Sequence, residues 1–150
     1  MIQRILIAVD DSPRAPHVLA TAVELALLAH ATVRVFTAVA VPPDLPPAAA
    51  TDHGDRLQGH LLRSAAARIE GVMATLPAVP HDLLVEEGHQ PARAILAAAA
   101  AYDADLIVLG SHGYDIVDRV LGTTAGSVAN TSPVDVLVVH RARKTTSRTP

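Results

Sequence analysis

Short runs of consecutive apolar residues recur along the chain, separated by longer segments with helical spacing. Residues 5–9 read Ile-Leu-Ile-Ala-Val, and residues 106–109 read Leu-Ile-Val-Leu. A run that is apolar at every position is typical of a strand buried on both faces of a sheet. With three further apolar segments, these runs predict strands at 5–9, 33–39, 82–85, 105–109 and 134–139.

The segments between these strands place apolar residues three and four positions apart. Val18 and Ala22 lie on one face of a helix that we expect to end near residue 30, with Ser12 as its N-cap and Pro13 at its first position. Three further helices with the same spacing are expected at about 55–75, at 92–101, and from 123 or 124 to 130.

Strands therefore alternate with helices from one end of the chain to the other. This order predicts a single-domain α/β fold, with a five-stranded parallel sheet that is Rossmann-like and covered by helices on both faces. Ligands of such sheets bind beyond the carboxyl ends of the strands, where the strand order reverses. The segments to consider are therefore 10–12 and 110–113, after the first and fourth strands. We expect the domain to span 1–140 and a polar, disordered tail to follow at 141–150.

Composition narrows the choice of function. Half of the 150 residues are hydrophobic, with one Phe, two Tyr and no Trp, and the formal net charge is −3. Nucleic-acid binding is not expected, because it needs clustered cations and stacking aromatics. The apolar runs are shorter than the ~20 residues of a membrane span. With no cysteine and no leader-like N-terminus, we expect a soluble, cytoplasmic protein without disulfides or thiolate metal sites.

Three glycines follow the fourth predicted strand: Gly110, Gly113 and Gly122, with Thr123 and Thr124 next in the chain. Glycine lets backbone N–H groups approach an anion closely, and the predicted helix adds its N-terminus. A helix dipole contributes only ~0.3–1 kcal/mol, whereas each charge-assisted hydrogen bond contributes about 1.5–3 kcal/mol. A single glycine would be explained by a turn, but this set favours a phosphate site built from several amides and hydroxyls.

Two other nucleotide motifs are excluded. A P-loop needs a lysine after its glycines, and the chain's one lysine is Lys144 in the predicted tail. No Gly-x-Gly-x-x-Gly follows the first strand, so the dinucleotide-binding fingerprint is absent too.

The glycine-spaced segment resembles the signature of the universal stress protein family, Gly-x-x-Gly, about nine residues, then Gly-Ser/Thr. Gly110, Gly113, Gly122 and Thr123 match it, and the first strand ends in an Asp, Asp10, as in that family. The resemblance covers residues 2–140 in order, including the Gly88-His89-Gln90-Pro91 turn. It implies the universal stress protein fold and a bound ATP, with ADP or AMP as alternatives, accompanied by Mg²⁺.

The chain departs from the family pattern in two places. Eight residues, 114–121, separate Gly113 from Gly122, one fewer than usual. Asp11 stands where many members have glycine, which places a negative charge near the expected site. Both departures bear on nucleotide affinity.

Other candidate site residues admit two interpretations each. Asp10 is expected to contact the ribose, with capping of the first helix as the alternative. Ala8, Val9 and Ala38 either line an adenine pocket or belong to the core. His112, between two candidate phosphate-binding amides, either contacts phosphate or a metal or faces solvent as a loop histidine.

Arg119 either neutralises a phosphate or forms a surface ion pair with Asp115 or Asp118. We expect no metal site of protein ligands alone, and no catalytic set can be assembled. The expected function is adenine-nucleotide binding in a stress-response or signalling module. The alternatives are a slow ATPase that uses the same loop and a dimeric scaffold that needs no nucleotide. The resemblance also implies a homodimer formed through the last strand, from Val134 to Val139, and a protein partner that the sequence does not identify.

Overall fold

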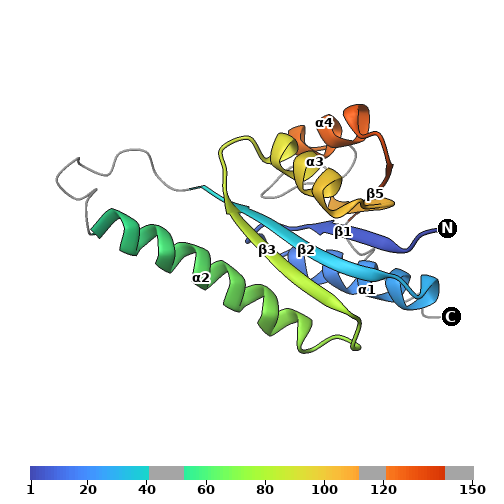
Figure 1. Cartoon of the computed structure of the whole chain (residues 1–150), viewed down its shortest axis with the longest axis horizontal. Helices are drawn as coiled ribbons and strands as arrows, with labels where there is room; N and C mark the ends of the chain where they lie inside the picture. Colours follow the sequence, from blue (N-terminus) through green and yellow to red (C-terminus); the bar gives the residue numbers. More distant parts are fainter. Residues whose placement is uncertain (41–52, 112–120, 141–150) are drawn as a thin grey trace, which may run out of the picture.

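Five strands and four helices alternate along the chain in a computed structural model that describes residues 1–40, 53–111 and 121–140. The predicted tail at 141–150 lies outside the described residues. Among the described residues, no helix has the length and apolar character needed to cross a membrane. Figure 1 shows the elements in order: β1 Arg4–Ala8, α1 Ala15–Ala29, β2 Thr32–Val39, α2 His53–Met73, β3 His81–Glu87, α3 Pro91–Tyr102, β4 Leu106–Gly110, α4 Thr123–Thr131 and β5 Asp135–Val139.

All five strands are parallel and lie in the order β3-β2-β1-β4-β5. The chain builds outward from β1 in one direction through β2 and β3, then crosses back to place β4 and β5 on the other side. The order therefore reverses between β1 and β4, where Ala8 pairs with Leu109. The predicted fold class is confirmed. The strand order reverses between β1 and β4, the two strands after which the sequence analysis expected the ligand site.

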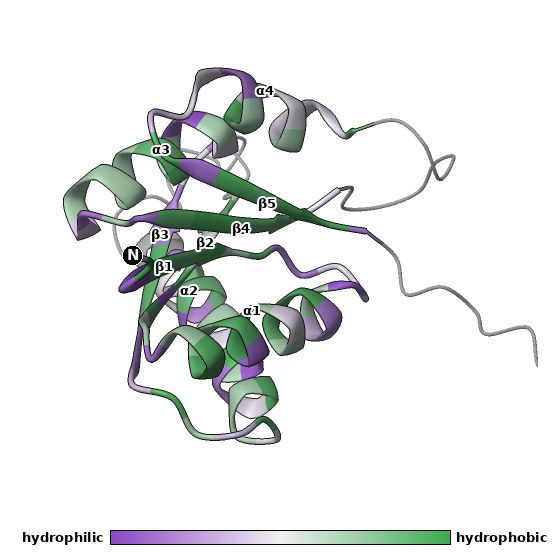
Figure 2. Cartoon of the chain, turned by 90° about the vertical axis from the view of Figure 1, so that its right-hand side faces the viewer, coloured by the Kyte–Doolittle hydropathy of each residue, from purple (hydrophilic) through white to green (hydrophobic). Residues whose placement is uncertain are grey.

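The helices form two layers around the sheet. Figure 2 shows α1 and α2 on one face and α3 and α4 on the other. Alternate residues of a strand point to opposite faces, so Ile5 and Ile7 of β1 join the core beneath α1, and Leu6 and Ala8 join the core beneath α3 and α4. Burial on both faces explains why β1 is apolar at nearly every position.

The first helix begins later than its sequence predicts. It starts at Ala15 with Arg14 as its N-cap and Pro16 in its first turn, so the prediction of Ser12 as N-cap and Pro13 as first helical residue is wrong. The carboxylate of Asp10 accepts a hydrogen bond from the Ser12 N–H at 3.0 Å, which makes a local turn before the helix. The Ser12 hydroxyl then accepts from the Arg14 N–H at 3.4 Å. The other boundaries move by one or two residues, including β5, which begins at Asp135 rather than Val134.

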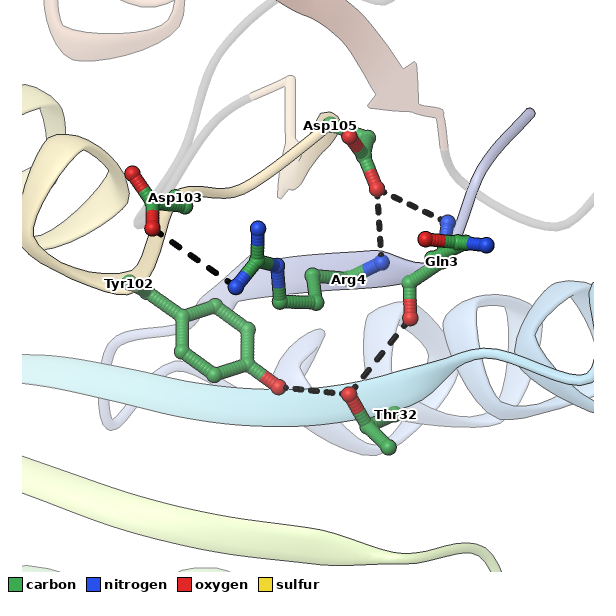
Figure 3. Close-up of polar contacts among 6 residues, drawn as sticks. All are labelled: Gln3, Arg4, Thr32, Tyr102, Asp103 and Asp105. Atoms are coloured by element: carbon green, nitrogen blue, oxygen red, sulfur yellow. Dashed lines mark hydrogen bonds and ion pairs between the residues drawn. The ribbon is translucent and has the colours of Figure 1, made fainter.

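Polar groups join the amino ends of β1 and β4 in a cluster that we call the amino-end clamp. Figure 3 shows its residues, which are Gln3, Arg4, Thr32, Tyr102, Asp103 and Asp105. One carboxylate oxygen of Asp105 accepts hydrogen bonds from the backbone N–H groups of Gln3 at 2.8 Å and Arg4 at 2.9 Å. The Thr32 hydroxyl lies 3.0 Å from the Tyr102 hydroxyl. The clamp fixes the sheet at the end opposite to the carboxyl ends of its strands.

Candidate functional site

A cavity of about 710 Å³ opens at the carboxyl ends of β1, β2 and β4. This volume lies within the roughly 300–1,000 Å³ usual for sites that bind small molecules. Much of its lining comes from apolar side chains of the strands and of α3 and α4: Ala8, Phe36, Ala38, Ile95, Leu109 and Ala125.

The pleat of the sheet places these apolar residues side by side. Phe36 and Ala38 are two positions apart on β2 and so project from the same face. Ala8 pairs with Phe36 on one side and with Leu109 on the other. The two alanines are small, and the wall they form with Phe36 and Leu109 suits a flat, apolar ring.

Residues with hydroxyl groups line another part of the cavity. Ser12 precedes α1, Ser111 follows β4, and Thr123 and Thr124 open α4. Ser12 and Ser111 are each only 4% exposed. A hydroxyl both donates and accepts hydrogen bonds, so this part of the cavity suits the sugar and phosphate groups of a ligand.

The two ends of the glycine-spaced segment are joined by backbone hydrogen bonds. The Ser111 N–H donates to the Val139 carbonyl at 3.0 Å, and the Ser111 carbonyl accepts from the Gly122 N–H at 2.7 Å. These bonds hold the start of α4 against the ends of β4 and β5. Gly122 is the N-cap of α4 and, as a glycine, has no side chain to cap the helix. The first N–H groups of a helix carry partial positive charge, and Gly122, Thr123 and Thr124, at the start of α4, line the cavity.

Asp10 lines the cavity, and its side chain stabilises the loop to which it belongs. One of its carboxylate oxygens accepts from the Ser12 N–H. A carboxylate accepts several hydrogen bonds, so this bond is compatible with a ribose contact at the same side chain. The ribose contact stays a prediction.

Eleven residues were predicted from the sequence to bind a nucleotide, and eight of them line the cavity: Ala8, Val9, Asp10, Ala38, Gly110, Gly122, Thr123 and Thr124. The other three, His112, Gly113 and Arg119, lie outside the described residues. That the eight contact a nucleotide stays a prediction.

Several lining residues were not nominated from sequence. They include Phe36, Ile95, Arg14, Gly88 and His89. Phe36 and Ile95 are indistinguishable from core residues by periodicity alone. Arg14, Gly88 and His89 precede the starts of α1 and α3, and the rule that ligands bind at the carboxyl ends of strands could have found these turns had it been extended to residue 14 and to the segment after the third strand.

The titratable side chains along the described part of the cavity are Asp10, Arg14 and His89. Among the described residues, no group of three or more His, Cys, Asp or Glu side chains has an arrangement that holds a metal ion. Asp11, beside the cavity, forms an ion pair with Arg68 of α2, with 3.9 Å between the nearest nitrogen and oxygen.

A five-stranded parallel sheet with a mixed apolar and hydroxyl-lined cavity at its switch point defines a Rossmann-like α/β protein whose cavity lies where proteins of this class bind small molecules. Residues 1–140 match the sequence model described as "Universal stress protein family". The chain belongs to the universal stress protein family.

Individual relatives agree with this assignment. The chain is 34% identical over 142 residues to a universal stress protein of Thermus aquaticus, covering 93% of this chain and all of the relative. A solved universal stress protein in complex with cAMP is 26% identical, with a TM-score of 0.62 and 93% and 97% of the two chains covered. One from Archaeoglobus fulgidus in complex with dAMP is 25% identical, with a TM-score of 0.58 and 92% and 98% covered.

Proposed function

We propose that this protein binds adenine nucleotides in the cavity at the carboxyl edge of its sheet and acts as a cytoplasmic stress-response module. The observation that carries the proposal is the meeting, in one cavity, of an apolar wall and the N-terminus of α4, whose N-cap is the glycine Gly122. The wall, with Ala8 and Ala38 in it, suits the adenine ring, and α4 with its two threonines suits phosphate.

The solved relatives support the adenine part of this proposal. Their ligands, cAMP and dAMP, share an adenine, a sugar and a phosphate. The chain belongs to the same family and has a cavity of sufficient size. We propose ATP as the preferred ligand, because the hydroxyls and helix N-termini around the cavity offer more donors than one phosphate requires.

Mg²⁺ fits this site only as a companion of the nucleotide. Mg²⁺ is usually held by one or two carboxylates together with substrate phosphates and water. Asp10 is the carboxylate among the described residues that line the cavity. With Asp10 expected to contact the ribose, we propose that the phosphates of bound ATP and water supply most of the coordination, and that magnesium neutralises phosphate charge.

The test is equilibrium binding of ATP, ADP, AMP, cAMP and adenosine by calorimetry, with and without Mg²⁺. Ala38→Met would fill the apolar part of the cavity and is expected to weaken all five ligands. Ala97→Met is the matched control, because Ala97 is exposed on α3 and does not line the cavity. The proposal fails if the native protein binds none of the ligands at millimolar concentration, or if both variants bind as it does.

We also propose a homodimer in which the two β5 strands pair. β5 is an edge strand of the sheet, with Leu137 37% exposed and Asp135 as its charged residue. The opposite edge, β3, carries charged or titratable side chains at both ends, which discourages pairing. The mass of the protein in solution, measured by light scattering, tests this proposal: a monomer at micromolar concentration contradicts it.

A further inference from the structure

We propose that Arg14 contacts the phosphate chain of the bound nucleotide and makes affinity rise with the number of phosphates. This inference rests on the proposed nucleotide binding and adds to it a residue that sets ligand preference. Arg14 lies in the loop between β1 and α1. It is therefore separate from the glycine-spaced segment, which leads into α4.

The position of Arg14 at the cavity is fixed by its backbone. Its N–H donates to the Ser12 hydroxyl at 3.4 Å, and its carbonyl accepts from His17 at 3.0 Å and Val18 at 3.1 Å. Ser12 is itself held by Asp10. Arg14 thus lines the cavity as the N-cap of α1, half-buried, on a loop anchored at both ends.

Charge gives Arg14 its role. Among the described residues lining the cavity, it is the side chain that carries a full positive charge at neutral pH, beside the negative Asp10 and the histidine His89. Asp11 adds a second negative charge at this loop, and Arg68 of α2 pairs with it. A polyphosphate entering the cavity therefore meets carboxylates that must be offset, and Arg14 is placed to offset them.

The chemistry of the guanidinium suits a phosphate chain. Its planar fork offers five N–H donors, which allows it to bond two phosphate oxygens while keeping contacts within the protein. Adenosine carries no phosphate and gains nothing from this group. The contribution of Arg14 is thus expected to be absent for adenosine and to increase from AMP to ADP to ATP.

The experiment measures dissociation constants of adenosine, AMP, ADP and ATP, in EDTA at fixed ionic strength, for the native protein, Arg14→Gln, Arg14→Lys and Arg93→Gln. Arg93 is the matched control, since it lies in the first turn of α3, is exposed, and is not part of the cavity lining. Arg14→Gln should weaken ATP binding about tenfold or more, as the loss of a charge-assisted hydrogen bond predicts. It should change adenosine binding less than about twofold, and Arg14→Lys should restore part of the loss.

Each result separates the inference from the proposed function. If the native protein binds ATP and Arg14→Gln binds it as tightly as Arg93→Gln does, the inference is wrong and nucleotide binding stands. Equal weakening of adenosine and ATP by Arg14→Gln also overturns it, because Arg14 would then act through the shape of the loop. If the native protein binds no nucleotide either in EDTA or with Mg²⁺, both fail. Thermal melts of all variants confirm that each is folded.

Discussion

His81, at the start of β3, lies between two acceptors at the surface. Its Nδ1 donates to the Val79 carbonyl at 3.0 Å, and its Nε2 lies 3.5 Å from a carboxylate oxygen of Glu70. The hydrogen bond to Val79 and, to a lesser extent, Glu70 raise the pKa of His81 above its ordinary value of 6.5. A protonated imidazole donates from both nitrogens at once, which explains the direction.

We therefore expect an NMR titration of His81 to give a pKa above 6.5, and Glu70→Gln to lower it only in part, because the Val79 carbonyl remains. A pKa that is raised on folding stabilises the protein fully below the unfolded value, and this stability is lost as pH rises through the folded pKa. The histidine should thus favour the folded state on the acidic side of neutrality. A His81 pKa at or below 6.5 in the native protein would contradict the geometry.

At the scale of single elements, α4 contains a glycine that its helix does not require. A Cβ added at Gly126 would lie 3.9 Å from the Cβ of Leu121, which is an ordinary contact, and no described glycine has a positive φ. Gly126→Ala should therefore stabilise the protein by about 0.5–1 kcal/mol, because alanine restricts the unfolded chain more than glycine does. Urea unfolding measures the change.

Gly71→Ala in α2 provides the comparison, since a Cβ there meets no atom within 4 Å. A similar gain is expected at both positions. If Gly71→Ala stabilises and Gly126→Ala destabilises, α4 must pack more tightly against its neighbours than these distances indicate.

The amino-end clamp makes the joining of β1 to β4 depend on pH. Hydrogen bonds from the backbone of Gln3 and Arg4 hold the pKa of Asp105 below its ordinary value of 3.8. Such a group stabilises the fold above its unfolded pKa, and the stability is lost as pH falls through the lower, folded value. Asp105→Asn should therefore lower the melting temperature at neutral pH, and the difference from the native protein should shrink as the solution becomes strongly acidic.

Asp103→Asn is the control for this prediction. Asp103 pairs with the Arg4 side chain at 3.6 Å on the surface, and exposed ion pairs contribute little. Its replacement should leave the melting temperature nearly unchanged at any pH. A larger effect from Asp103 than from Asp105 would mean that the clamp acts through the Arg4 side chain.

At the scale of the whole molecule, the two edge strands of the sheet, β3 and β5, differ in how readily they can pair with a second copy of the chain. Leu137→Lys places a charge in the middle of β5 and should convert the proposed dimer to a monomer in light scattering. Leu28→Lys is the control, because Leu28 is 82% exposed on α1 and should leave the mass unchanged. Dissociation caused by Leu28→Lys but not by Leu137→Lys would place the interface on α1 instead.

Local spacing was sufficient to predict the elements of the fold, because burial on one or two faces of a strand or helix leaves a periodic pattern in the chain. It did not predict the start of α1. There, Pro16 has no N–H to donate to the Ser12 carbonyl, which accepts from the Ala15 N–H at 3.1 Å instead, so the helix begins only at Ala15. Apolar spacing reports which face of a helix is buried, and it does not report which of the first backbone hydrogen bonds can form.

The sequence by itself determined the α/β class, the buried character of β1 and β4, and the glycine-spaced segment as a candidate phosphate site, since each depends on residues that are neighbours in the chain. Only the tertiary structure decided that β1 lies between β2 and β4. That order brings Phe36, Ala38 and Arg14 to the same cavity as Gly122. Strand order is set by how the crossover helices pack on the sheet, so residues from separate elements become one site only after the chain has folded.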